Sequence, residues 1–118
     1  MTTPADELAA AVETLRARLT DPELTPGPWL SLDHGDRLLY DGPGAEDQPP
    51  VYVVDEPMSN GANADYIELM HPGVGAALAD WLETTAEALA ATTHPGWQEC
   101  VASNALAVAR QINAAARP

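Results

Sequence analysis

Residues 25–29 have the sequence Thr-Pro-Gly-Pro-Trp, and this turn separates two regions of the chain with different patterns of apolar residues. Two prolines that bracket a glycine cannot continue a helix, because proline lacks a backbone N–H and its ring clashes with the preceding helical turn. The turn therefore ends any helix that precedes it and delivers Trp29 into the segment that follows.

The segment before the turn has the apolar period of a helix. Thr3 is a suitable N-cap and Pro4 suits the first helical position. Apolar residues then recur at steps of 4, 3 and 4, at Leu8, Val12, Leu15 and Leu19. We predict a helix from Pro4 to Leu19 that ends before Asp21-Pro22.

The segment after the turn has the features of a small antiparallel sheet. Residues 29–33 and 37–41 are short strand-like runs, and His-Gly-Asp at 34–36 is a suitable hairpin turn. Residues 51–54 form the best strand in the chain by composition. The intervening loop, residues 42–50, is rich in glycine, proline and acidic residues, and we expect it to be mobile.

The rest of the chain returns to a helical period. Residues 63–70 predict a helix capped by Asn63, which Pro72 restarts or kinks. One apolar stripe then follows at Val74, Leu78, Trp81, Leu82, Thr85 and Leu89. A final helix after Pro95 carries a second stripe at Trp97, Val101, Ala105, Val108 and Ile112. These stripes place Trp81 and Trp97 in the core, leaving Trp29 as the most exposed tryptophan.

His-Pro-Gly occurs twice, at residues 71–73 and 94–96, each time just before a helical pattern. The simplest interpretation is local: the histidine caps the helix, and the proline occupies its first position.

The order of elements predicts an α+β fold: an N-terminal helix, a small antiparallel three-stranded sheet, then two or three C-terminal helices. A chain of 118 residues fits one domain. Residues 1–20 would form its first helix, 25–56 its β-rich segment with the acidic loop, and 62–116 its helical segment. The abundance of alanine and the absence of phenylalanine suggest closely spaced helices.

The charge of the chain limits its partners. It has 18 acidic and 5 basic residues, for a formal charge of −13. Such a field repels nucleic acid and anionic membranes, so we expect no direct nucleic-acid partner and no membrane partner. Basic proteins, cations and neutral small molecules remain. The single cysteine, Cys100, is expected in the core; it excludes an intrachain disulfide and fits a cytoplasmic location, as does an N-terminus without a signal peptide.

Two acidic motifs provide an enzymatic alternative. Asp65 and Glu68, and likewise Asp80 and Glu83, are pairs of carboxylates one helical turn apart. If the two pairs met, they could hold Mg²⁺. The pattern resembles the acidic motifs of all-α nucleotide pyrophosphatases of the MazG type, which implies a Mg²⁺-dependent nucleotide pyrophosphatase. The simpler interpretation is that these acids face water. No other cofactor motif and no catalytic motif is present.

A third alternative comes from the acids of the β-rich region. They could form the surface of an inhibitor that mimics DNA and binds a basic protein, or simply a solvated face. These acids are Asp33, Asp36, Asp41, Glu46, Asp47, Asp55, Glu56 and Asp65.

Two patches, residues 25–31 and 63–83, resemble a group of small phage and actinobacterial proteins that includes the Ead/Ea-like phage early-region proteins. The shared features are the Thr-Pro-Gly-Pro-Trp turn before a small sheet, and an Ala-Asp-x-x-Ile helix that leads through a proline step into the next helix. This sequence has His71 before that proline, where Asp or Asn is more usual. The resemblance implies a phage or prophage accessory setting and transfers no catalytic residue.

The leading hypothesis is therefore a non-enzymatic accessory protein of a phage or mobile element. It would bind and modulate a host protein, or sequester a small ligand, without a cofactor. Self-association is compatible with the alanine-rich helical faces. The predicted partner-binding residues are Trp29, Tyr66, His71, Asp80, Glu83 and Glu87.

Overall fold

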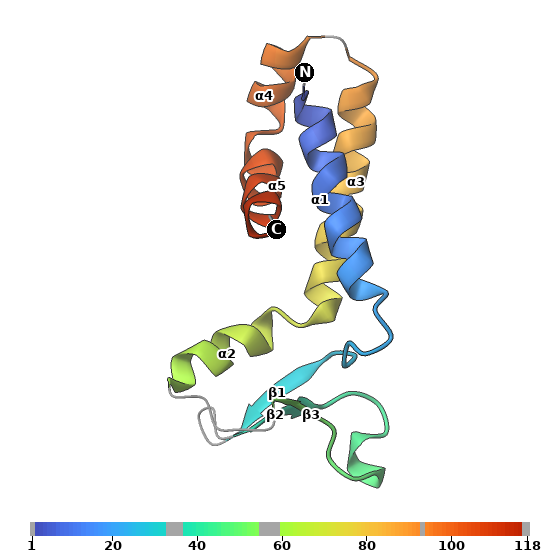
Figure 1. The fold of residues 1–118 in the computed structure, drawn as a ribbon, viewed down its shortest axis with the longest axis vertical. Coiled ribbons are helices and arrows are strands. Elements are labelled where there is room, and N and C mark those ends of the chain that lie inside the picture. Colours follow the sequence, from blue (N-terminus) through green and yellow to red (C-terminus); the bar gives the residue numbers. More distant parts are fainter. Residues whose placement is uncertain (1, 33–36, 55–59, 93, 117–118) are drawn as a thin grey trace. The chain divides into compact units, whose positions relative to one another are not determined.

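A computed structural model describes residues 2–32, 37–54, 60–92 and 94–116. It confirms the α+β prediction, with an N-terminal helix, a three-stranded antiparallel sheet and several C-terminal helices (Figure 1). The elements are α1 (Pro4–Leu19), β1 (Trp29–Leu32), β2 (Arg37–Tyr40), the 3-10 turn η1 (Ala45–Asp47), β3 (Tyr52–Val54), α2 (Gly61–Leu69), α3 (Pro72–Ala90), α4 (Pro95–Val101) and α5 (Ser103–Ala115).

The chain divides into two compact units. Residues Met1–Asp21 and Ala76–Pro118 form what we call the helical unit, and Pro22–Gly75 form the β-rich unit. The first boundary between the units lies after α1, between Asp21 and Pro22. It is close to the Thr-Pro-Gly-Pro-Trp turn at residues 25–29, where the sequence predicted a break. The single-domain organisation stays a prediction.

The start of α1 is fixed by reciprocal hydrogen bonds. The Thr3 side chain accepts a hydrogen bond from the Asp6 amide, and the Asp6 carboxylate accepts one from the Thr3 amide, both at 3.1 Å. This capping box satisfies two amides that a helix start leaves without intrahelical partners. The bounds Pro4–Leu19 and the Thr3 cap confirm the sequence prediction. The hydrogen bonds from Thr3 hold the pKa of the Asp6 carboxyl below its usual 3.8.

The core of the helical unit is built largely from leucine and alanine. Its buried members are Leu8, Ala11, Val12, Leu82, Leu89, Ala102, Ala105, Leu106 and Ala109, contributed by α1, α3 and α5 and the residue before α5. Four of these nine residues are alanines, whose small side chains allow helix backbones to approach closely. At the surface Arg16 of α1 reaches Asp80 and Glu83 of α3, at 3.2 and 3.0 Å.

The placement of two tryptophans differs from the prediction. Trp81 is 44% exposed and Trp97 is 50% exposed, and Cys100 is also exposed. Each tryptophan immediately precedes a buried residue, Leu82 on α3 and Gln98 on α4. Consecutive helical residues point about 100° apart because a turn contains 3.6 residues. The predicted stripes were therefore correct at Leu82, Leu89 and Ala105, which are buried, and wrong at Trp81, Trp97 and Val101, which are exposed.

Gln98 explains why α4 buries a polar side chain. Its amide nitrogen donates hydrogen bonds at 2.8 Å to the Leu89 carbonyl and to the Thr92 hydroxyl. Leu89 lies in the last turn of α3 and Thr92 just beyond it, and the Leu89 carbonyl also accepts hydrogen bonds from the Thr92 amide and hydroxyl. These hydrogen bonds connect α4 to the end of α3. They explain why the face of α4 that carries Gln98 is the buried one.

The final helical segment is also interrupted. A single helix after Pro95 was predicted, but α4 ends at Val101 and α5 begins at Ser103, with the buried Ala102 between them. Ser103 and Asn104 follow the break. Serine and asparagine are weak helix formers in the interior and are favoured near helix starts, because their side chains compete for backbone hydrogen bonds.

The β-rich unit contains the sheet in the order β1-β2-β3, with both pairs antiparallel. In β1 and β2, Trp29 pairs with Tyr40 and Leu32 with Arg37; the predicted turn at 34–36 lies outside the described residues. The amide of Ser31 in β1 donates to the Glu68 carboxylate of α2 at 2.8 Å. Leu38 and Ala64 are the fully buried apolar residues of this unit.

One detail of the β-rich unit corrects the sequence analysis, and a second describes the acidic loop. The cap of α2 is Asn60, whose side chain accepts a hydrogen bond from the Ala62 amide at 3.0 Å, and Asn63 lies inside the helix. The loop of residues 42–50, expected to be mobile, contains η1 and a hydrogen bond of 2.9 Å from the Tyr40 hydroxyl to the Pro43 carbonyl. Gly44 precedes η1 at φ 84°, a conformation that glycine adopts without strain.

Replacing Gln98 by alanine should lower the free energy of unfolding. The substitution removes a buried donor and leaves a cavity, so a loss of about 1–3 kcal/mol is expected. Chemical denaturation measures it, with Gln111→Ala on the exposed side of α5 as the control. Equal stabilities of the two variants would contradict the role assigned to Gln98.

The Asp6 carboxylate should make a contribution to stability that depends on pH. Because its pKa is lowered in the folded state, the contribution is complete above the ordinary value of 3.8 and is lost as pH falls through the lower folded value. The difference in unfolding free energy between wild type and Asp6→Ala should therefore be largest near neutral pH and shrink below pH 3.8. A difference that does not change with pH would rule this out.

Candidate functional site

Residues 25–31 and 63–83, the two segments that carry the family resemblance, approach each other at Gly27 and His71. A Cβ atom built on Gly27 would lie 2.5 Å from His71 Nδ1, so only glycine fits without displacing the ring. The Trp29 indole folds back on the same turn, donating to the carbonyls of Thr25 and Pro26 at 3.2 and 3.1 Å. The Thr-Pro-Gly-Pro-Trp turn therefore serves as packing for the start of α3, with Trp29 half-buried.

Both histidines act as helix caps, which confirms the local interpretation of the His-Pro-Gly repeats. His71 Nδ1 accepts a hydrogen bond from the Gly73 amide at 3.0 Å. His94 Nδ1 accepts one from the Trp97 amide at 3.1 Å. Each histidine thus uses Nδ1 as an acceptor for a backbone amide in the first turn of the helix that follows it. His71, one of the predicted partner-binding residues, therefore caps the start of α3.

The predicted partner-binding residues do not all belong to one unit. Trp29, Tyr66 and His71 lie in the β-rich unit, whereas Asp80, Glu83 and Glu87 lie in the helical unit. Asp80 and Glu83 share Arg16, and these acids raise the pKa of its guanidinium. Of these three acids, Asp80 and Glu83 therefore already form ion pairs with an arginine of the same chain.

The carboxylates of the metal-site alternative are divided in the same way. Asp65 and Glu68 belong to the β-rich unit, and Asp80 and Glu83 to the helical unit. Glu68 accepts the Ser31 amide, while Asp80 and Glu83 bind Arg16. Across the described ranges no three His, Cys, Asp or Glu side chains form a group that could hold a metal ion.

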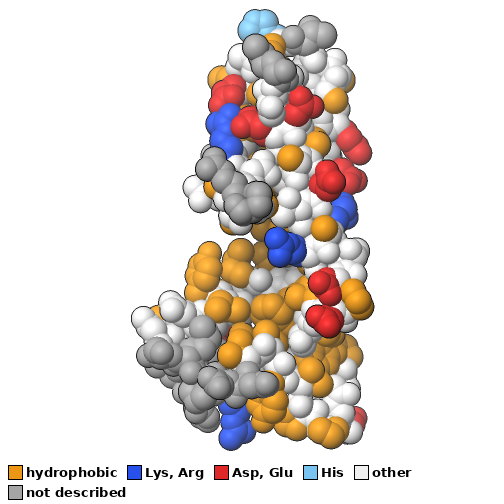
Figure 2. All heavy atoms as spheres, in the orientation of Figure 1, with side chains coloured by type: hydrophobic (Ala, Val, Ile, Leu, Met, Phe, Trp, Pro, Cys, Tyr) orange, Lys and Arg blue, Asp and Glu red, His pale blue; other side chains and the backbone are white. Residues whose placement is uncertain are grey.

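An apolar surface on α2 was not recognised from the sequence as a surface. Tyr66, Leu69 and Met70 are 64%, 66% and 44% exposed. Tyr66 and Leu69 are three residues apart on one face of α2, and Met70 is the cap residue that follows the helix. We call these three residues the α2 face. Figure 2 shows hydrophobic side chains gathered over α2 and the sheet, where Leu32, Val51 and Tyr52 are also exposed.

The sequence shows the apolar spacing of the α2 face but does not show whether these residues are buried or exposed. Apolar residues at that spacing are usually buried, and of these three residues only Tyr66 was predicted to bind a partner. What distinguishes this helix is that its buried residue is the small Ala64, on the side opposite the large ones. The sequence alone cannot reveal which side of so short a helix meets the sheet.

The β-rich unit also carries most of the negative charge. Between residues 22 and 75 the sequence has ten acidic residues and one arginine, a formal charge of −9 out of the −13 of the whole chain. A large exposed apolar face within so acidic a unit is suited to a partner with apolar and basic groups.

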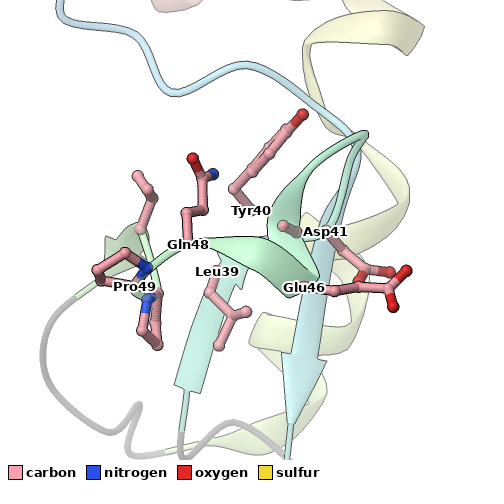
Figure 3. A pocket seen from close by; sticks show the side chains of 9 residues that line it. Leu39, Tyr40, Asp41, Glu46, Gln48 and Pro49 are labelled. Carbon is pink, nitrogen blue, oxygen red and sulfur yellow. The ribbon is translucent and has the colours of Figure 1, made fainter.

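A small hollow lies at the end of β2 against the folded acidic loop (Figure 3). Its volume is about 160 Å³. The lining residues come from β2, η1 and the approach to β3, and they are Leu39, Tyr40, Asp41, Ala45, Glu46, Gln48, Pro49, Pro50 and Val51. A volume this small is below the roughly 300 Å³ at which sites for drug-sized ligands begin.

Comparison of the chain with models of protein families, with curated proteins and with solved structures gives no match. No helix in the described part of the chain combines the length and apolar character needed to cross a lipid bilayer.

The contact between Gly27 and His71 can be tested by a double-mutant cycle. Gly27→Ala should destabilise the protein by about 1–3 kcal/mol, because the new methyl group overlaps the imidazole ring. The same substitution should cost less in a His71→Ala background, where the overlap is absent. Chemical denaturation of the four proteins measures the coupling. Additive effects would show that the two residues do not touch.

Proposed function

We propose that this protein is a non-enzymatic binding protein that recognises a basic protein partner through the α2 face. The observation that carries the proposal is the exposure of Tyr66, Leu69 and Met70 on one side of α2. Tyrosine and methionine are enriched in protein–protein interfaces, and burial of large apolar side chains provides most of the binding energy there. Exposing three of them together costs solubility, which a binding role would explain.

The charge of the β-rich unit supports a basic partner. A formal charge of −9 raises the rate of encounter with a positively charged surface and disfavours acidic partners. A mimic of DNA would bind mainly through regularly placed acids. The apolar α2 face favours an ordinary protein interface, with the acids arranged around it.

The setting of this interaction rests on the resemblance of residues 25–31 and 63–83 to small phage and actinobacterial proteins. It suggests an accessory protein of a phage or mobile element that acts in the cytoplasm on a host protein. The Thr-Pro-Gly-Pro-Trp turn would then be a structural element that leads into β1 and packs on His71, and the α2 face would be the part that recognises the partner.

The proposal predicts that binding depends on the α2 face. Tagged wild-type protein and a Tyr66→Ala/Leu69→Ala variant are used to recover proteins from an actinobacterial lysate, followed by quantitative mass spectrometry. Recovery of a specific basic protein should fall about tenfold or more in the variant, since truncating central apolar residues typically costs over 1 kcal/mol each.

The matched control is Val101→Ala, which truncates an exposed apolar residue of the helical unit. Circular dichroism checks that each variant is folded. A partner that the double variant retains and Val101→Ala loses would exclude the α2 face. Native mass spectrometry of the purified protein separates a host partner from a second copy of the chain, whose like charge opposes association.

A further inference from the structure

The hollow at the end of β2 has a wall suited to an aliphatic chain. Leu39, Pro49, Pro50 and Val51 contribute apolar groups. The backbone behind them is fixed by hydrogen bonds, from the Tyr40 amide to the Val51 carbonyl and from the Asp41 amide to the Pro28 carbonyl, both at 2.9 Å. The hollow is therefore held by both neighbouring strands and exists before any ligand arrives.

Two carboxylates stand at one end of this hollow. Asp41 and Glu46 both line it, and Figure 3 shows them on the same side, with Pro49 at the other end. Among the described residues, neither side chain has an ion-pair or hydrogen-bond partner. This distinguishes them from Asp80, Glu83, Glu7 and Glu99, which bind arginines of the chain itself.

The other polar side chains of the lining do not join this pair. The Tyr40 hydroxyl donates to the Pro43 carbonyl, and Figure 3 shows Tyr40 and Gln48 pointing away from Asp41 and Glu46. The hollow thus offers apolar groups and, on one side, two negative charges.

An arginine side chain has the complementary structure. Its methylene stem is apolar, and its planar guanidinium presents five N–H donors in a fork that matches carboxylates. A hollow of about 160 Å³ has the volume of roughly five water molecules, at about 30 Å³ each, and so admits one side chain rather than a metabolite. Lysine has the stem but only a compact ammonium, which cannot span both carboxylates with paired donors.

We infer that this hollow receives an arginine side chain of the protein partner. The inference rests on the proposed function for the existence of that partner and adds a second anchor, chemically different from the α2 face. The acids Asp41 and Glu46 supply the charge, and the proline-rich wall supplies the contact for the stem.

The test uses blocked amino acids and needs no partner. Nitrogen-15-labelled full-length protein is titrated with N-acetyl-arginine N-methylamide and followed by NMR. We expect saturable shift changes confined to residues 39–51, with weak affinity because a single exposed side chain is bound. The lysine analogue should bind more weakly, and the uncharged citrulline analogue should not bind. Equal shifts with lysine, or shifts spread over the acidic surface, would overturn the inference.

Matched variants separate the hollow from general charge attraction. Glu46→Gln should weaken binding of the arginine probe about threefold to fivefold, the range expected for one exposed charge-assisted contact. Asp47→Asn removes the same charge from the adjacent residue of η1, which does not line the hollow, and should leave binding nearly unchanged. Equal losses in the two variants would mean that only the overall field attracts the probe, and the inference would fail.

A guanidinium group could come from an arginine residue of a protein or from the free amino acid, and a titration with free arginine distinguishes the two. Its α-ammonium offsets its α-carboxylate, so its net charge equals that of the blocked form. It should therefore bind no more tightly than the blocked form if the hollow is made for a residue within a protein. Tighter binding of free arginine would overturn the assignment and point to a small ligand. Because these measurements do not involve the α2 face, their failure would leave the proposed function standing, and loss of the partner would leave the probe result intact.

Discussion

Gly27 and His71 lie so close together that no side chain other than hydrogen fits at position 27, and the arrangement of the β-rich unit depends on this contact. His71 accepts the Gly73 amide and so starts α3. The turn that contains Gly27 leads directly into β1, whose Ser31 amide is bound by Glu68 of α2. One close approach therefore connects the first strand, the helix that bears the exposed apolar residues, and the beginning of the next helix.

In the helical unit, a buried amide has the comparable role. Gln98 binds the end of α3 through Leu89 and Thr92, and the face that α4 turns inward follows from that choice. A buried polar group needs hydrogen-bond partners, and the Gln98 amide nitrogen finds backbone and side-chain oxygens just after and at the end of α3. Within the described structure its Oε1 is buried without such a partner. The consequence is that Trp97 and Val101 remain outside, although the apolar pattern favoured them for the core.

Charge is distributed unequally over the chain, and this bears on function. The arginines Arg16 and Arg110 of the helical unit each bind two acids, which keeps much of its charge balanced internally. In the β-rich unit the acids greatly outnumber the single arginine, Arg37. The exposed α2 face and the hollow beside Asp41 and Glu46 lie in this acidic unit, so apolar anchoring and recognition of positive charge are available in the same part of the molecule.

The sequence by itself determined the features that depend on neighbours along the chain. Periodicity, prolines and caps gave α1 with its Thr3 cap, the break at residues 25–29, the strands and the histidine caps, because each acts over a few residues. The tertiary structure decided which side of each helix is buried. Gln98 is buried through acceptors on α3, and Tyr66 is exposed because Ala64 faces inward. It likewise assigned the carboxylates of the predicted metal site to separate partners. Contacts between residues far apart in the sequence leave no pattern among neighbouring residues. The spacing of apolar and charged residues along the chain therefore cannot show which of these contacts form.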